Sequence, residues 1–135
     1  MNGCFVPLSG FIKLGETMLT IALSINIAVL VPVLIVLLLN DKRAVFAWGE
    51  NTSGRKILFA LYAAILLASA SLLSLHLHNI DITAWAQAVL GLQVIYKLLT
   101  VPLVGLRNPV VLSNIAIAAF HTATLLSISG GAPAL

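Results

Sequence analysis

Hydrophobic residues form four long runs along the chain, and charged positions are concentrated in the stretches between them. The runs extend from Thr17 to Leu39, Ile57 to His76, Ile82 to Val104 and Val110 to Ser129. Each run approaches or exceeds the roughly 20 residues that a helix needs to cross the hydrocarbon core of a bilayer. The pattern therefore predicts an all-α fold: a single integral membrane domain of four transmembrane helices at about 17–40, 56–77, 82–104 and 109–129, arranged as two helical hairpins.

The composition agrees with this membrane assignment. Of the 135 residues, 61% are hydrophobic and only 8% are charged, whereas soluble domains carry roughly 25% charged residues. Four crossings use nearly the whole chain, which leaves no room for a soluble catalytic domain. The sequence also has no phosphate-binding glycine loop, nucleophile elbow or zinc-protease pair. We therefore expect a protein that is not an enzyme and holds no metal.

Two stretches outside the runs are candidates for a short helix that lies along the membrane surface. The head, residues 1–15, mixes apolar residues with Pro7, Gly10 and Gly15, and is either interfacial or a loosely ordered terminus. The first loop, residues 40–56, has an aromatic anchor and basic residues, so Ala44 to Trp48 is predicted to form a short interfacial helix.

Basic residues predict the orientation. The first loop carries four of them and the turn between the third and fourth helices carries another, whereas the second loop has no Lys or Arg. Cytoplasmic loops are enriched in Lys and Arg, so the first and third connections are predicted to be cytoplasmic and both termini non-cytoplasmic. The predicted location is a bacterial inner (plasma) membrane. These basic residues are Lys42, Arg43, Arg55, Lys56 and Arg107.

Polar side chains inside the runs fall at two predicted depths. A rise of about 1.5 Å per residue places one residue from each helix near mid-membrane, and a deeper pair roughly 10 Å from the inner surface. In the pair, the Lys97 ammonium is expected to meet the amide oxygen of Asn114. Lipid-facing positions would be costly, so both groups should face protein or a water-filled cavity. The mid-depth layer comprises Asn26, Ser69, Gln93 and His121.

Each of these residues has a structural interpretation beside a functional one. Asn26, Gln93 and Asn114 are expected mainly to form hydrogen bonds between helices. Lys97 either snorkels its amine to the headgroups or lines a conduction path. His121 is first a neutral interior histidine, then a proton carrier, then an axial ligand to a heme or chlorophyll-type pigment. No cofactor is predicted.

Small residues recur at helical spacing in the second and fourth helices. Such ridges let another backbone approach closely, so each helix is predicted to pack against a neighbour in this chain or in another. The packing residues are Ala60, Ala64, Ala68 and Ser71 in the second helix, and Ala116, Ala119, Ala123 and Ser127 in the fourth.

Three functions follow from the sequence in decreasing order. The first is a noncatalytic accessory or structural subunit that packs beside a larger membrane protein complex, because no Asp or Glu lies inside a helix core to couple transport. The alternative is a small oligomeric transporter or channel for protons, ions or small amphiphiles. The third is tetrapyrrole binding through His121. The expected partners are the lipid bilayer and a larger complex or homo-oligomer, with no nucleic acid.

Overall fold

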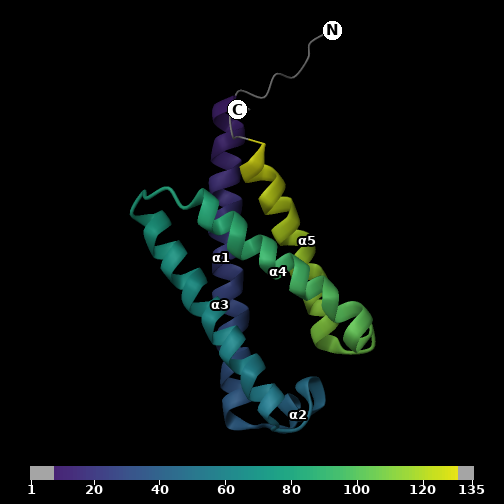
Figure 1. Cartoon of the computed structure of the whole chain (residues 1–135). Coiled ribbons are helices and arrows are strands. Elements are labelled where there is room, and N and C mark those ends of the chain that lie inside the picture. Colours follow the sequence, from purple (N-terminus) through teal and green to yellow (C-terminus); the bar gives the residue numbers. More distant parts are fainter. Residues whose placement is uncertain (1–7, 131–135) are drawn as a thin grey trace.

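The computed structural model describes residues 8–130, and all regular structure in that range is helical. The helices are α1 (Leu8–Leu39), α2 (Lys42–Trp48), α3 (Ser53–Leu77), α4 (Thr83–Val104) and α5 (Pro109–Ser129) (Figure 1). Four of them, α1, α3, α4 and α5, are long and apolar enough to cross a membrane. The predicted all-helical class with four long apolar helices is confirmed.

The predicted start of the first helix is wrong. The chain is already helical from Leu8, so Gly10 and Gly15 lie inside α1. A glycine inside a helix costs about 1 kcal/mol relative to alanine, which is why the sequence indicates a boundary there. At Gly15 packing outweighs that cost, because a Cβ atom would lie only 3.3 Å from the carbonyl oxygen of Ser127 in α5. Residues 8–15 are therefore neither a separate segment nor a loose terminus, while residues 1–7 lie outside the described residues.

The short helix predicted in the first loop is present as α2. The Asp41 carboxylate caps it by accepting a hydrogen bond from the Arg43 backbone at 3.2 Å. The Arg43 guanidinium also forms an ion pair with Asp41 at 2.7 Å. This side-chain hydrogen bond holds the pKa of the Asp41 carboxyl below its ordinary value. The helix ends at Gly49, whose φ of 80° is accessible to glycine at little steric cost.

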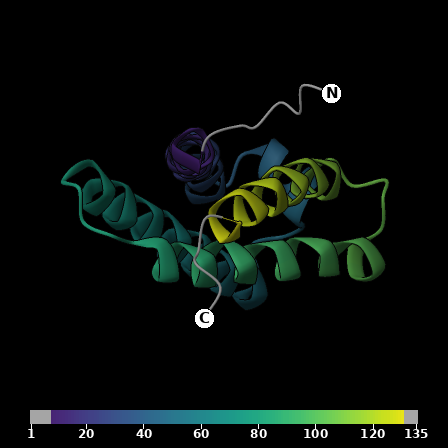
Figure 2. The ribbon, with the colours of Figure 1, turned by 90° about the horizontal axis from the view of Figure 1, so that it is seen from above.

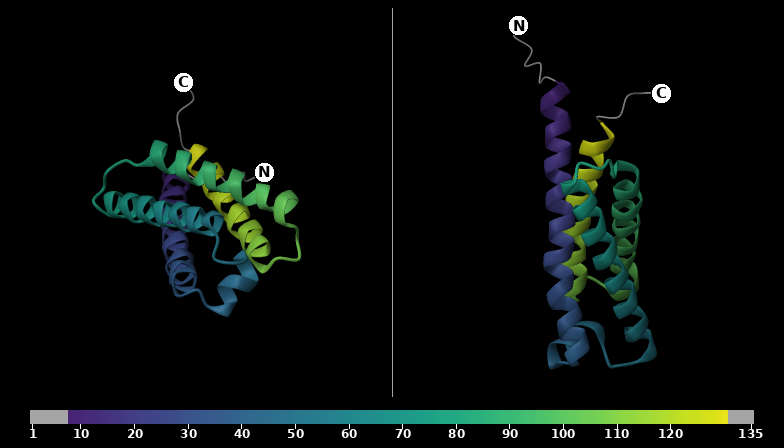
Figure 3. Two further views of the ribbon diagram at one scale, coloured as in Figure 1. Left: turned by 60° about the horizontal axis from the view of Figure 1, so that its bottom comes forward. Right: turned by 90° about the vertical axis from the view of Figure 1, so that its left-hand side faces the viewer.

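The long helices pack as two neighbouring pairs. α1 lies against α3, α4 lies against α5, and α1 also contacts α5. Seen along the bundle, α1 is set between α3 and α5 (Figure 2). α1 and α5 are close where α1 begins and α5 ends, and they separate toward the end that carries α2 (Figures 1 and 3). That divergence opens space between the two pairs at the α2 end.

The distribution of side chains is the reverse of that in a soluble bundle. Large aliphatic residues such as Leu38, Leu67, Leu103 and Leu126 are exposed, while the buried face of α5 includes Asn114, His121 and Thr124. Two apolar clusters complete the interior. One contains Leu19, Ala22, Leu23, Leu72, Ile82, Ala86 and Leu90, and the other, toward α2, contains Leu30, Leu37, Ala44, Tyr62 and Ile65.

Candidate functional site

A cavity of about 580 Å³ lies between the two helix pairs at the α2 end. This volume is in the range of small-molecule sites. Its apolar wall comes chiefly from α1, where Val29, Leu30, Val33 and Val36 lie on successive turns, and from Ile117 of α5. Residues at spacings of three and four share one helix face, which explains how α1 presents a continuous aliphatic surface.

The opposite wall carries a buried amine. Lys97 of α4 is only 5% exposed and lines the cavity with Tyr96. Its Nζ atom donates a hydrogen bond to the Tyr96 hydroxyl at 3.0 Å and lies 5.0 Å from the centre of the Tyr96 ring. It also contacts Asn114 Oδ1 of α5 at 3.5 Å, the contact expected from the sequence depths. All of these partners are neutral.

The Asn114 amide is held by α4. Its Nδ2 atom donates to the Thr100 hydroxyl at 3.4 Å, and Thr100 donates to the Lys97 carbonyl oxygen at 2.6 Å. With its amide nitrogen engaged in this way, Asn114 presents its amide oxygen to the Lys97 amine. The polar wall is therefore positioned by bonds both within α4 and between α4 and α5.

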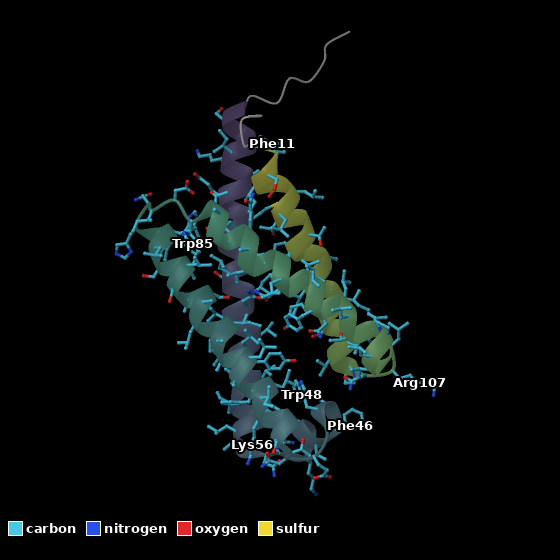
Figure 4. The ribbon with its side chains drawn as sticks, viewed as in Figure 1. Phe11, Phe46, Trp48, Lys56, Trp85 and Arg107 are labelled. Atoms are coloured by element: carbon cyan, nitrogen blue, oxygen red, sulfur yellow. The ribbon has the colours of Figure 1, made fainter. Side chains whose placement is uncertain are left out.

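α2 covers the end of the cavity with aromatic and basic residues. Phe46 and Trp48 line it together with Lys42 and Arg43, and Figure 4 shows Phe46 and Trp48 at this end of the molecule. The helix is attached on both sides. Arg55 of α3 donates to the Gly49 carbonyl at 2.7 Å and to the Asn40 side chain, and Asn108 donates to the Ala47 carbonyl at 2.9 Å.

The predicted mid-depth layer is a separate buried group. Asn26 of α1 joins two other helices: its Nδ2 atom donates to Ser69 of α3 at 3.1 Å, and its Oδ1 atom lies 3.0 Å from Nε2 of His121 of α5. An amide oxygen only accepts, so Nε2 of His121 carries the proton in this arrangement. None of these three side chains lines the cavity.

Gln93 contributes the fourth helix to this layer without joining the network. It is 1% exposed, and neither atom of its amide has a hydrogen-bond partner among the described residues. The Nδ1 atom of His121 is likewise unpartnered within that range. Of the four predicted members, the structure therefore connects Asn26, Ser69 and His121 and leaves Gln93 buried beside them.

Apolar packing separates this layer from the far end of the bundle. The cluster that contains Leu23, Ile82 and Leu90 is almost completely buried at that end. Beyond it a second cavity, of about 740 Å³, is lined by residues at the helix ends, including Glu16, His76 and Asp81. The two openings therefore lie at opposite ends with packed aliphatic side chains between them.

The chain matches no protein-family model, and comparisons with curated proteins and with solved structures give no match. Its function is therefore inferred from the geometry of the site.

The small-residue ridges lie mainly on the outer surface. Of the eight predicted packing residues, only Ser127 is buried, and Ala68 is half-buried. The other six are exposed: Ala60, Ala64, Ser71, Ala116, Ala119 and Ala123. Within this chain α3 and α5 pack through other residues, among them Ile65, Ser69 and Ala118.

Several cavity residues have no distinctive signal in the sequence. The aliphatic face of α1 resembles any other part of an apolar run, and the Tyr62 side chain that lines the cavity comes from α3. The spacing of Tyr96 and Lys97 places them on the same polar side of α4, but only the fold shows that this side meets α1 and α2 across an open space. Pairing Lys97 with the basic residues of α2 required the three-dimensional arrangement.

Proposed function

We propose that this chain is an integral membrane protein whose α1, α3, α4 and α5 cross the bilayer, with the α2 end cytoplasmic and both termini on the other side. An apolar exterior around buried polar groups suits a hydrocarbon solvent. The basic residues gather at the α2 end, where Lys56 lies beside α2 and Arg107 occupies the α4–α5 turn (Figure 4). That distribution follows the positive-inside rule.

Within this membrane protein, the cavity serves to hold a small amphiphile, and the protein is noncatalytic. The observation that carries this proposal is the two-sided lining, with an aliphatic α1 wall facing the polar group of Tyr96, Lys97 and Asn114. A lipid tail alone needs no polar wall, and a small ion needs no aliphatic wall. A molecule with both an apolar and a polar part satisfies both sides.

Two other functions have less support from the geometry. Conduction of ions or protons through a single chain would require passage through the buried aliphatic cluster around Leu23 and Leu90. Tetrapyrrole ligation by His121 would require its Nε2 atom to leave Asn26, or its Nδ1 atom to face an open space, whereas His121 is 0% exposed.

Tryptophan quenching tests the amphiphile site, since the sequence has two tryptophans and only Trp48 lines the cavity. In phosphatidylcholine nanodiscs, the Trp85→Phe variant isolates Trp48 and the matched Trp48→Phe variant isolates Trp85, which is exposed on α4. Bromine-labelled dodecyl amphiphiles should quench Trp48 saturably and Trp85 only in proportion to partitioning. Non-saturable quenching of both would refute an amphiphile site.

A second function, docking beside another membrane protein, is favoured by one observation. The ridges of α3 and α5 are exposed, so their small side chains are available to a helix outside this chain. We propose this accessory role as compatible with the cavity. Ala64→Leu and Ala119→Leu should reduce co-purification of larger species from native membranes in mild detergent, whereas Leu67→Ala should not. A wild-type chain that migrates as a monomer at its own mass would contradict docking.

A further inference from the structure

Lys97 is a buried cation whose contacts within the described chain are all neutral. The Tyr96 hydroxyl, the Tyr96 ring and the Asn114 amide oxygen surround its amine at 3.0, 5.0 and 3.5 Å. Hydroxyl and amide oxygens and an aromatic face all interact favourably with a cation, but they do not neutralise it. Buried charges in proteins are normally paired. An anion at this position would complete the environment of the amine.

The other charged residues around the cavity have the same sign. Lys42 and Arg43 line it from α2, and no acidic side chain lines it among the residues that the structure describes. Arg43 is paired with Asp41, the one ion pair within residues 8–130, so Lys42 and Lys97 retain uncompensated charge. The cavity therefore attracts anions and repels cationic ligands.

We propose that the occupant of this cavity is an anionic amphiphile whose headgroup pairs with the Lys97 amine. This inference rests on the proposed function, and it adds the charge of the ligand and the residue that recognises it. The aliphatic chain lies against Val29, Val33 and Ile117, across the cavity from the amine. A carboxylate and a phosphate monoester share the required chemistry, because each offers anionic oxygens to an ammonium donor.

The role of Lys97 differs from simple snorkelling. A snorkelling lysine extends its amine to the headgroup region, whereas this amine is engaged by Tyr96 of its own helix and Asn114 of α5 and is 5% exposed. Lys56 offers a matched comparison, because it is basic, lies at the same end of the molecule (Figure 4) and is exposed outside the cavity lining.

The test measures quenching of Trp48 in the Trp85→Phe background, in phosphatidylcholine nanodiscs, by brominated dodecanoate, dodecyl phosphate, dodecanol and dodecyltrimethylammonium. The two anions should bind about tenfold or more tightly than the neutral and cationic probes after correction for partitioning, since tenfold corresponds to about 1.4 kcal/mol. Lys97→Met should remove this preference, while Lys97→Arg and Lys56→Met should retain it. Stronger binding of one anion identifies the headgroup as carboxylate or phosphate.

Contrary results separate the two proposals. Saturable binding of dodecanol or the cationic probe as tight as that of the anions would overturn the headgroup inference and leave the amphiphile site standing. No saturable binding of any probe would overturn the proposed function itself. Inorganic phosphate that displaces both anionic probes, with affinity independent of an alkyl chain, would show a free-anion site and overturn the inference. If Lys97→Met fails to fold, the comparison among the four probes on the chain with Lys97 intact still decides the headgroup inference.

Discussion

At the scale of single residues, burial and hydrogen bonding divide the polar interior into groups with different tasks. Asn26 satisfies Ser69 and His121 simultaneously and so ties α1 to α3 and α5. Gln93 is as deeply buried but has no partner within the described chain. Residues of the same chemical type at the same depth therefore differ in what they contribute, and substitutions should reveal this difference.

Asn26→Leu and Gln93→Leu form a matched pair of stability tests. Asn26→Leu leaves two buried polar groups unpaired and should lower the free energy of unfolding by about 1 kcal/mol, given roughly 0.6 kcal/mol per hydrogen bond between membrane helices. Gln93→Leu removes a buried amide without partners in the described chain and should be neutral or stabilising. Unfolding by denaturing detergent, followed by tryptophan fluorescence, measures both. A larger loss for Gln93→Leu would contradict this division.

Asp41 is predicted to restrain anion binding through Arg43. Asn also caps helices well, so Asp41→Asn should keep α2 folded, free the Arg43 guanidinium and tighten binding of dodecanoate, as measured by quenching of Trp48. Weaker binding would argue against this role, and Glu50→Gln, which alters the other acid of this loop, serves as the control. Because the pKa of Asp41 is lowered, stability from the ion pair is fully present above the ordinary carboxyl pKa and is lost as pH falls through the lowered one.

At the scale of elements, the sequence predicts helices better than it predicts their faces. Runs of hydrophobic residues mark α3, α4 and α5 because every helix in lipid must be apolar along its length. The same feature hides the inward face, since an apolar residue suits both the core and the lipid. The small-residue ridges therefore indicate close packing without a direction, and the structure places most of them outward.

Polar residues are more informative about faces, because burial is the economical place for each of them in a membrane helix. Asn26, Ser69, Gln93, Lys97, Asn114 and His121 are all buried, as their types and depths indicate. The partners of each are not predictable in this way. The separation between the layer around Asn26 and the cavity around Lys97 depends on how α1 and α5 diverge, which is a property of packing between elements.

The closest approach of α1 to α5 is predicted to depend on Gly15. A Cβ atom there would lie 3.3 Å from Ser127 O and 3.5 Å from the Ile128 side chain. Gly15→Leu should separate the helices at this end and lower the free energy of unfolding. Gly91→Ala is the matched control, since nothing lies within 4 Å of its added Cβ, and helix propensity alone should raise stability by up to about 1 kcal/mol. Equal effects of both substitutions would rule out a special contact at Gly15.

At the scale of the whole molecule, the cavity results from unequal contact between the two helix pairs. α1 and α5 meet near Gly15 and Ser127 and diverge toward α2 (Figure 3). α2 then spans the open end, attached by Arg55 on one side and by Asn108 on the other. The open half of the bundle is thus the half that carries the basic residues, so its side of the membrane decides which compartment supplies the ligand.

Thiol labelling of intact cells or oriented vesicles tests that orientation. In a Cys4→Ser background, which removes the single native cysteine, cysteines are introduced singly in place of Lys56, Arg107, Phe11 and Trp85. The first two lie at the α2 end and the last two toward the other end (Figure 4). A membrane-impermeant maleimide added outside should label positions 11 and 85 and reach 56 and 107 only after permeabilisation. The opposite pattern would reverse the orientation, and labelling of all four from outside would contradict four crossings of a bilayer.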